Sequence, residues 1–139
     1  MNPTAPRRVL AAPGGDSARF GPDSDYGAQV WLAVIGPSSW TLWQRLARGA
    51  MLHPAGWTTS LEELAGVLGL GSPRGTQAGI ARALRRLDRF GIAREVHDGL
   101  LVVRCRLPFV SPGQLQRLHP AVQAVHHRLR DRCLAPCVS

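Results

Sequence analysis

The strongest constraint on the fold is the order of segments between residues 57 and 106: a capped helix, a glycine-rich turn, a second helix and a tight hairpin. Ser60-Leu-Glu-Glu63 forms a capping box, in which the serine hydroxyl accepts a hydrogen bond from the Glu63 amide and the Glu63 carboxylate reaches back to the Ser60 amide. The sequence therefore predicts a helix that begins after Ser60 and ends at Gly69 or Gly71 in a left-handed cap. The predicted buried stripe of this helix consists of Leu61, Leu64, Ala65 and Leu68.

A second helix is predicted over residues 75–90, after a turn at 71–75. When its residues are projected at about 100° each, one side is apolar and consists of Ile80, Ala83, Leu84, Leu87 and Gly91. The opposite side consists of Ala78, Arg82, Arg85, Arg86 and Arg89. Guanidinium groups three or four residues apart repel one another by roughly a few tenths of a kcal/mol per pair, so an anionic partner such as a phosphate backbone explains the strip. The alternative is a strip of solvated arginines with no partner.

A hairpin is predicted next, because residues 92–97 and 100–106 are strand-like and flank the two-residue turn Asp98-Gly99. Pairing His97 with Leu100 directs one side of the hairpin toward the core, namely Val96, Leu101, Val103 and Cys105. Residues 57–59 are short and β-prone and are expected to add a small third strand. The expected fold class is therefore mainly α with a small β-hairpin, with extra helices at both ends.

Residues 57–106 resemble the winged helix-turn-helix DNA-binding regulators of the broad MarR and GntR kind, in a form typical of GC-rich bacteria. The residues that carry the resemblance are Leu61-Glu-Glu-Leu-Ala65, Leu68-Gly-Leu70, Ala81-Arg-Ala-Leu84, Leu87 and Gly91-Ile92. The resemblance implies that helix 75–90 lies in the major groove of double-stranded DNA, with its N-terminal residues nearest the base edges.

The residues expected to contact DNA are Thr76, Gln77, Arg82, Arg85, Arg86, Arg89, Arg74, Arg94 and Arg104. The resemblance implies that Thr76, Gln77 and Arg82 read bases, because glutamine pairs bidentately with adenine and arginine with guanine. The other three arginines of the helix are expected to hold phosphates. Asp98 at the hairpin tip would repel a phosphate. The flanks of the hairpin are therefore expected to make weaker backbone contacts, through Arg94, Arg104 and Arg106.

The charge of the chain agrees with an anionic partner. Its 139 residues carry a net charge of +8, with a sequence pI of about 11.3. Three arginines and three aspartates cancel within residues 1–36, so the whole excess belongs to residues 37–139. All seventeen basic residues are arginine, which together with abundant Ala, Gly and Pro indicates a GC-rich bacterial genome and weakens the argument from arginine number alone.

Three regions are predicted along the chain. Residues 1–27 are rich in proline and glycine and are expected to be disordered or loosely attached. Residues 28–110 are expected to form the winged domain with leading helices at 28–35 and from Ser38 or Ser39 to Met51. The second leading helix is expected to cover the domain with Trp40, Trp43, Leu46, Ala47 and Ala50. Core packing explains the four tryptophans better than an aromatic box for a small-molecule effector.

Residues 111–135 are predicted to form two short helices, at 111–118 and from Pro120 to Cys133. Their apolar residues follow a 3,4,3,4 spacing, namely Leu115, Leu118, Val122, Val125 and Leu129. Such a seam suits a homodimer, and packing against the protein's own core is the alternative.

Metal, catalytic and membrane functions are not expected. Cys133 and Cys137 follow His126-His127, but no further pair completes a tetrahedral zinc site, so no metal or other cofactor is predicted. The chain has no glycine-rich phosphate loop, nucleophile elbow or paired apolar carboxylates, so it is not expected to be an enzyme. No apolar run reaches the length of a membrane span or of a secretory signal, which predicts a cytoplasmic, nucleoid-associated protein.

The function that these patterns favour is sequence-specific binding of double-stranded DNA as a transcriptional regulator, acting as a repressor by occupying an operator. A plasmid or phage DNA-maintenance factor is an alternative with the same fold. A protein-interaction module that docks an acidic partner on the arginine strip is the other alternative.

Overall fold

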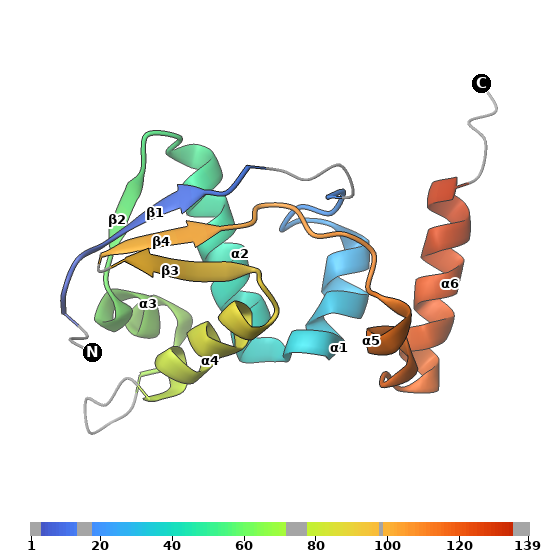
Figure 1. The fold of residues 1–139 in the computed structure, drawn as a ribbon. Helices are drawn as coiled ribbons and strands as arrows, with labels where there is room; N and C mark the ends of the chain where they lie inside the picture. The colour runs from blue at the N-terminus through green and yellow to red at the C-terminus, as the bar shows by residue number, and fades with distance from the viewer. Residues whose placement is uncertain (1–3, 14–17, 72–77, 98, 135–139) are drawn as a thin grey trace.

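The computed structural model describes residues 4–13, 18–71, 78–97 and 99–134 (Figure 1). The strands are β1 (Arg7–Ala11), β2 (Trp57–Thr59), β3 (Ala93–His97) and β4 (Leu100–Val103). The helices are η1 (Gly27–Trp31, a π-helical turn), α1 (Leu32–Ile35), α2 (Pro37–Leu52), α3 (Leu61–Leu68), α4 (Ala78–Arg89), α5 (Pro112–Gln116) and α6 (Pro120–Leu134).

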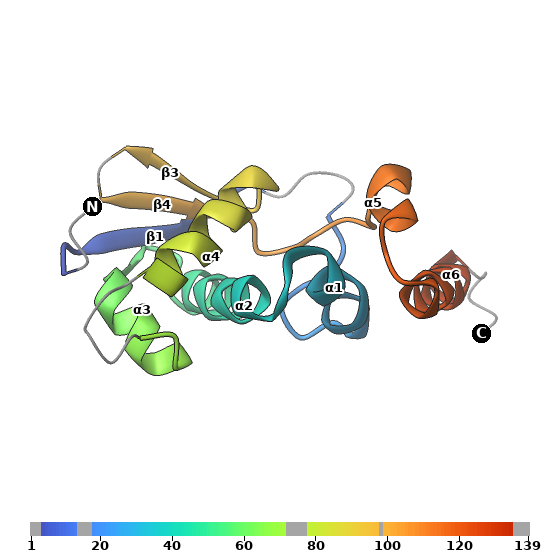
Figure 2. The same ribbon diagram turned by 90° about the horizontal axis from the view of Figure 1, so that it is seen from below.

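The strands form one sheet in the order β2-β1-β4-β3, with β1 antiparallel to β2 and parallel to β4. Helices α2, α3 and α4 lie together on one side of this sheet (Figure 2). The order α2-β2-α3-α4-β3-β4 is that of a winged helix, with α3 and α4 as the helix-turn-helix pair and β3-β4 as the wing. The protein is thus a small α+β winged-helix-like fold with additional helices at both ends.

Strand β1 corrects the expectation that residues 1–27 are disordered or loosely attached. It occupies the middle of the sheet, where Val9 is fully buried and aligns with Leu101 of β4. Farther along, Phe20 forms a β-bridge with Leu107 and is buried. A parallel pairing across about ninety residues leaves no local signal in the sequence, which is why composition alone suggested disorder.

Helix α3 begins as predicted, because the Ser60 hydroxyl accepts a hydrogen bond from the Glu63 amide at 3.1 Å. The second half of the capping box differs: the Glu63 carboxylate accepts a hydrogen bond from the Thr59 hydroxyl at 3.2 Å. Gly69, at φ +68°, ends the helix in the left-handed conformation. The amide of Leu70 then closes a Schellman motif onto the Ala65 carbonyl at 2.8 Å.

Helix α4 buries the predicted apolar side, namely Ile80, Ala83, Leu84 and Leu87. It ends in a second Schellman motif, in which the Ile92 amide donates to the Leu87 carbonyl at 2.9 Å and Gly91 adopts φ +69°. Gly91 is therefore an exposed cap residue and not part of the buried side, which corrects that part of the prediction.

The hairpin has the predicted pairing of His97 with Leu100, and Leu101 and Val103 are buried. An irregularity between Glu95 and His97 shifts the register, so the side chain of Val96 is half exposed instead of reaching the core. A bulge inserts one residue on one strand and reverses the facing of its neighbour, which the alternation of apolar residues does not reveal.

The leading helices carry the predicted aromatic core. Helix α2 buries Trp40, Trp43, Leu46, Ala47 and Ala50, as expected. The indole nitrogen of Trp43 donates to the Arg104 carbonyl at 2.7 Å, and that of Trp31 donates to the Pro108 carbonyl at 2.8 Å. Buried indole N–H groups require such acceptors, so these bonds connect the leading helices to the segment after the wing.

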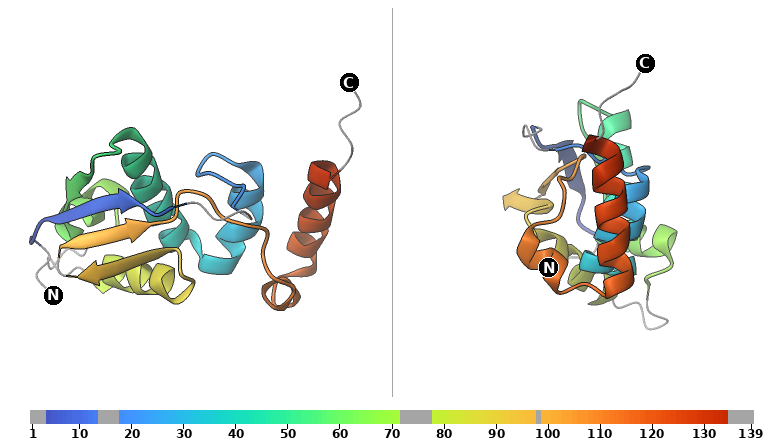
Figure 3. Two further views of the ribbon diagram at one scale, coloured as in Figure 1. Left: turned by 45° about the horizontal axis from the view of Figure 1, so that its top comes forward. Right: turned by 90° about the vertical axis from the view of Figure 1, so that its right-hand side faces the viewer.

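Helices α5 and α6 lie at the end of the molecule opposite the sheet (Figure 3). Ser111 and Gln114 form a complete capping box at the start of α5. The predicted seam packs against the protein's own core, with Leu129 buried and Leu115, Leu118, Val122 and Val125 partly buried. In the described part of the chain, no helix is both long and apolar enough to cross a bilayer.

Candidate nucleic-acid interface

The exposed side of α4 is the most basic helical face in the described chain. Its four arginines, Arg82, Arg85, Arg86 and Arg89, are all exposed. At about 100° per residue they fall within roughly one quarter to one third of the helix circumference. Seen from below, α4 lies at the front of the molecule beside α3 and β3, with no other helix or strand drawn over it (Figure 2).

Packing fixes the orientation of this strip. Ile80 and Leu87 on the opposite side are fully buried, so α4 cannot rotate without exposing them to water. Burial of each such side chain is worth about 1.5–3 kcal/mol. The arginines are therefore held outward by the apolar residues between them.

A first small cavity extends the strip toward the start of α2. It has a volume of about 200 Å³, and its lining includes Arg82, Arg86 and residues 36–39. Pro37 occupies the first turn of α2, where the helix offers amides without partners within the helix. Two guanidinium groups thus share a concavity with the positive end of a sixteen-residue helix, an arrangement that favours an anion.

A second small cavity continues the strip toward α5. It has a volume of about 230 Å³, and its polar lining consists of Arg86, Gln114 and Arg117. Arg86 borders both cavities, so it lies at the centre of a basic surface that spans α2, α4 and α5. The sequence prediction missed Arg117 and residues 36–39, because only tertiary packing brings them beside α4.

Arg94 lies beside α4 as well, but its charge is partly compensated. Its Nε lies 3.5 Å from an Oδ1 of Asp88, and the two side chains are 69% and 57% exposed. An ion pair this exposed contributes at most about 1 kcal/mol. The pair is weak enough for a phosphate to compete with Asp88 for Arg94.

The remaining predicted contacts fall into two groups. Arg104 lines a different cavity, with Met51, Cys105 and the end of β1, and it lines neither cavity beside α4. Arg74, Thr76 and Gln77 lie outside the described residues. The structure therefore brings together Arg82, Arg85, Arg86, Arg89 and Arg94, and separates Arg104 from them.

The groups with shifted pKa values lie away from α4. Burial raises the pKa of the Cys105 thiol and that of the Tyr26 hydroxyl. Burial also lowers the pKa of His126, and the neighbouring His127 and Arg130 add to this effect. Over residues 4–13, 18–71, 78–97 and 99–134, no three His, Cys, Asp or Glu residues gather in a way that could hold a metal ion.

Comparison with known proteins gives one informative likeness. No protein-family model matches the chain, and no curated protein matches it. The fold is similar to the crystal structure of primosome protein DnaB (residues 1–300) from Geobacillus stearothermophilus, with a TM-score of 0.59 and 13% sequence identity. The likeness covers 100% of this chain and 54% of that one, so the chain spans about half the length of that structure. At this identity the likeness concerns the fold alone.

Proposed function

We propose that this protein binds double-stranded DNA in a sequence-specific manner through helix 75–90 and regulates transcription, as a repressor that occupies an operator. The observation that carries the proposal is the strip of exposed arginines on α4, the second helix of a helix-turn-helix. In winged and related helix-turn-helix proteins this helix enters the major groove. The nucleoid of a bacterial cytoplasm is the location that follows from this role.

We assign the predicted DNA-contacting arginines different roles according to their position. Arg82 lies nearer the start of the helix, where base edges are within reach, and we propose it as a base reader together with Thr76 and Gln77. Arg85, Arg86 and Arg89 follow along the helix and are proposed to hold phosphates, with Arg94 as a weaker contact. Arg74 and Arg104 remain in the proposal as peripheral contacts, of which Arg104 is the weakest candidate because it lies apart from α4.

A homodimer through α5 and α6 belongs to the same proposal, because one recognition helix reads only a few base pairs and two-fold pairing doubles the site. Partly buried Leu115, Leu118, Val122 and Val125 offer an apolar surface for a second copy. The same residues also pack on the protein's own core, so the contact between copies would be small.

A second candidate function is a DNA-maintenance role in replication of a plasmid or phage. The observation that favours it is the likeness over the whole chain, including the terminal helices, to the structure of a primosome protein. In this role the α4 strip would hold a DNA site for other proteins and would need fewer base-specific contacts.

Selection from random duplex DNA with the purified full chain tests the proposal. We expect an enriched motif, and a palindromic motif would support the homodimer. Arg82→Ala should relax the preference at one position of that motif, at a cost of about 1–3 kcal/mol. Arg86→Ala should weaken binding to all sequences alike and reduce the salt slope by about one.

Two results would redirect the proposal. Duplex binding without an enriched motif would contradict base reading and favour the maintenance role. No duplex binding at low salt would contradict both DNA roles and favour the remaining alternative, in which the arginine strip docks an acidic protein partner.

A further inference from the structure

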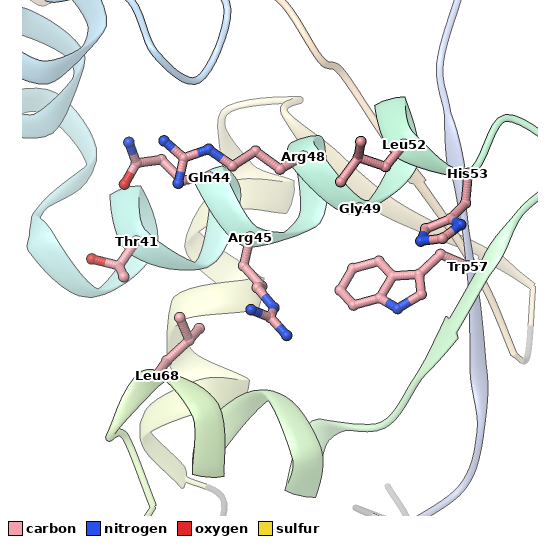
Figure 4. A pocket seen from close by; sticks show the side chains of 9 residues that line it. All are labelled: Thr41, Gln44, Arg45, Arg48, Gly49, Leu52, His53, Trp57 and Leu68. Carbon is pink, nitrogen blue, oxygen red and sulfur yellow. The ribbon is translucent and has the colours of Figure 1, made fainter.

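A groove on the outer side of α2 carries a second basic surface that the α4 strip does not use. Its volume is about 420 Å³, and it lies between α2, the start of β2 and the end of α3 (Figure 4). Arg45, Arg48 and Leu52 lie at intervals of three and four residues along α2, so they form one wall. Trp57 and Leu68 close the opposite side, and His53 lies at one end.

The indole ring of Trp57 packs closely against Gly49 of α2. A Cβ at residue 49 would overlap three adjacent carbons of the ring, Cδ2, Cε3 and Cζ3, at nearly equal distances. Gly49 therefore lies against the face of the ring and not against its edge. Glycine has a low helix propensity, and the close approach of Trp57 gives a structural reason for a glycine in the last turn of α2.

One guanidinium lies over the ring, and a second lines the same groove. The guanidinium carbon of Arg45 lies 5.9 Å from the centroid of the Trp57 ring, which is a cation–π distance. Arg48 forms an ion pair with Asp23, and both side chains are largely exposed, so an incoming anion can displace that carboxylate. None of the described residues that line the groove is acidic.

We propose that this groove binds single-stranded nucleic acid, with a base on Trp57 and the adjoining phosphates on Arg45 and Arg48. A planar aromatic surface beside guanidinium groups matches a planar base joined to a phosphate. The bases of an intact duplex are stacked on one another, so an unpaired strand presents the face that this site requires.

The open shape of the groove favours a strand over an enclosed small ligand. Arg45, Arg48, Leu52 and His53 are exposed, so a bound nucleotide would remain partly in water and would gain from neighbouring phosphates on the same chain. Apolar side chains that would suit an acidic amphipathic peptide are few here, since Leu52 and Leu68 are the only leucines among the lining residues that the structure describes.

The site is separate from the α4 strip. None of the described lining residues belongs to α4, and the cavities beside α4 include neither Trp57 nor Arg45. The two surfaces can therefore be inactivated one at a time, and loss of one function is distinguishable from loss of the other.

Tryptophan fluorescence and anisotropy test the proposal with the full chain and a labelled oligothymidylate of about twelve nucleotides, a length within the usual site size. Trp31, Trp40 and Trp43 are at most 5% exposed, so quenching of accessible emission by the strand reports on Trp57. We expect Trp57→Ala to weaken binding of the strand about tenfold, in line with the loss of one stacked base. Arg45→Ala, at an exposed position that does not endanger folding, should weaken it roughly threefold or more.

Matched measurements decide among the outcomes. Arg128→Ala removes the same charge from exposed α6 and should change the affinity for the strand by less than about twofold. Duplex affinity should stay unchanged in Trp57→Ala. The proposal is overturned if Trp57→Ala and Arg45→Ala both bind the strand within twofold of the unaltered protein. It is also overturned if free dAMP binds as tightly as the strand, or if polyglutamate competes equally well at the same ionic strength.

Discussion

Helices α4 and α6 both carry several arginines, yet the structure gives them different settings. The four arginines of α4 share one exposed strip, whereas Arg130 of α6 points roughly opposite to Arg128 and Arg132 when projected at about 100° per residue. Arg130 lies over the Phe109 ring at 5.7 Å, and Asp131 lies between the α6 arginines in sequence. In a chain whose basic residues are all arginine, their arrangement and not their number indicates a binding surface.

The two helices also differ in how they are held. Helix α4 buries four apolar side chains and ends in a Schellman motif. Helix α6 buries only His126 and Leu129 among its described residues. His126 Nδ1 lies 2.8 Å from the Tyr26 hydroxyl, which also accepts a hydrogen bond from the Val110 amide at 2.9 Å. The helix with more buried apolar side chains, α4, is therefore the one that presents the arginine strip.

The largest difference is expected for leucine truncations. Leu87→Ala in α4 should lower the free energy of unfolding by about 2–5 kcal/mol, because it opens a cavity at a fully buried position. Leu129→Ala should mainly reduce hydrogen-exchange protection of α6, since this residue lies at the end of the molecule and retains 8% exposure. Denaturant unfolding together with hydrogen exchange measures both effects, and equal global losses would contradict the contrast.

Attachment of α6 can be weakened through its polar contact. Tyr26→Phe leaves the Val110 amide and the His126 ring nitrogen without the hydroxyl, and should cost about 1–3 kcal/mol. The loss should appear in urea unfolding and as faster exchange of α6 amides. Unchanged exchange in α6 would show that this contact does not hold the helix.

Lowering the pH should weaken the same contact, between Tyr26 and His126. The pKa of His126 is lowered from 6.5 by burial, by His127 and by Arg130, so the unfolded chain binds a proton at higher pH than the folded one. The stabilising contribution is therefore complete above about pH 6.5 and is lost as pH falls through the folded pKa. His126→Gln should flatten the dependence of unfolding free energy on pH in this range, and an unchanged slope would contradict the assignment.

The smallest effect is expected at the edge of the α4 strip. Asp88→Asn removes the exposed ion pair to Arg94 and should change stability by less than about 1 kcal/mol. The substitution also removes the acid beside the strip, so duplex affinity should rise modestly at low salt. Weaker duplex binding would indicate that Asp88 positions Arg94 for contact.

Local signals allowed part of this fold to be predicted. Helix α3 follows from a serine cap, a glycine cap and apolar periodicity, and α4 follows from apolar periodicity, all of which involve neighbours in sequence. Strand β1 could not be predicted, because its partners lie in β2 and β4 and its first residue, Arg7, is a buried arginine, a residue type that is rarely inside. The bulge that exposes Val96 was missed for a related reason, since pairing geometry decides it.

The candidate site could likewise be predicted only in part. Periodicity alone places Arg82, Arg85, Arg86 and Arg89 on one exposed face. The cavities that extend this face join α4 to residues 36–39 and to Arg117, and the groove at Trp57 joins α2 to β2. These cavities form between elements that are distant in sequence, so they depend on how the helices pack. Residue spacing within one segment does not predict them.

Whether α4 forms the duplex-binding surface can be tested with two double variants that lower the net charge equally, from +8 to +6. Arg85→Ala with Arg89→Ala alters α4, and Arg128→Ala with Arg132→Ala alters α6. Duplex affinity is measured as a function of salt for both and for the unaltered protein. The α4 pair should reduce the slope of log affinity against log salt by about two, as expected for two lost phosphate contacts, while the α6 pair should leave it nearly unchanged. Equal reductions in both variants would contradict the claim that α4 forms the duplex-binding surface.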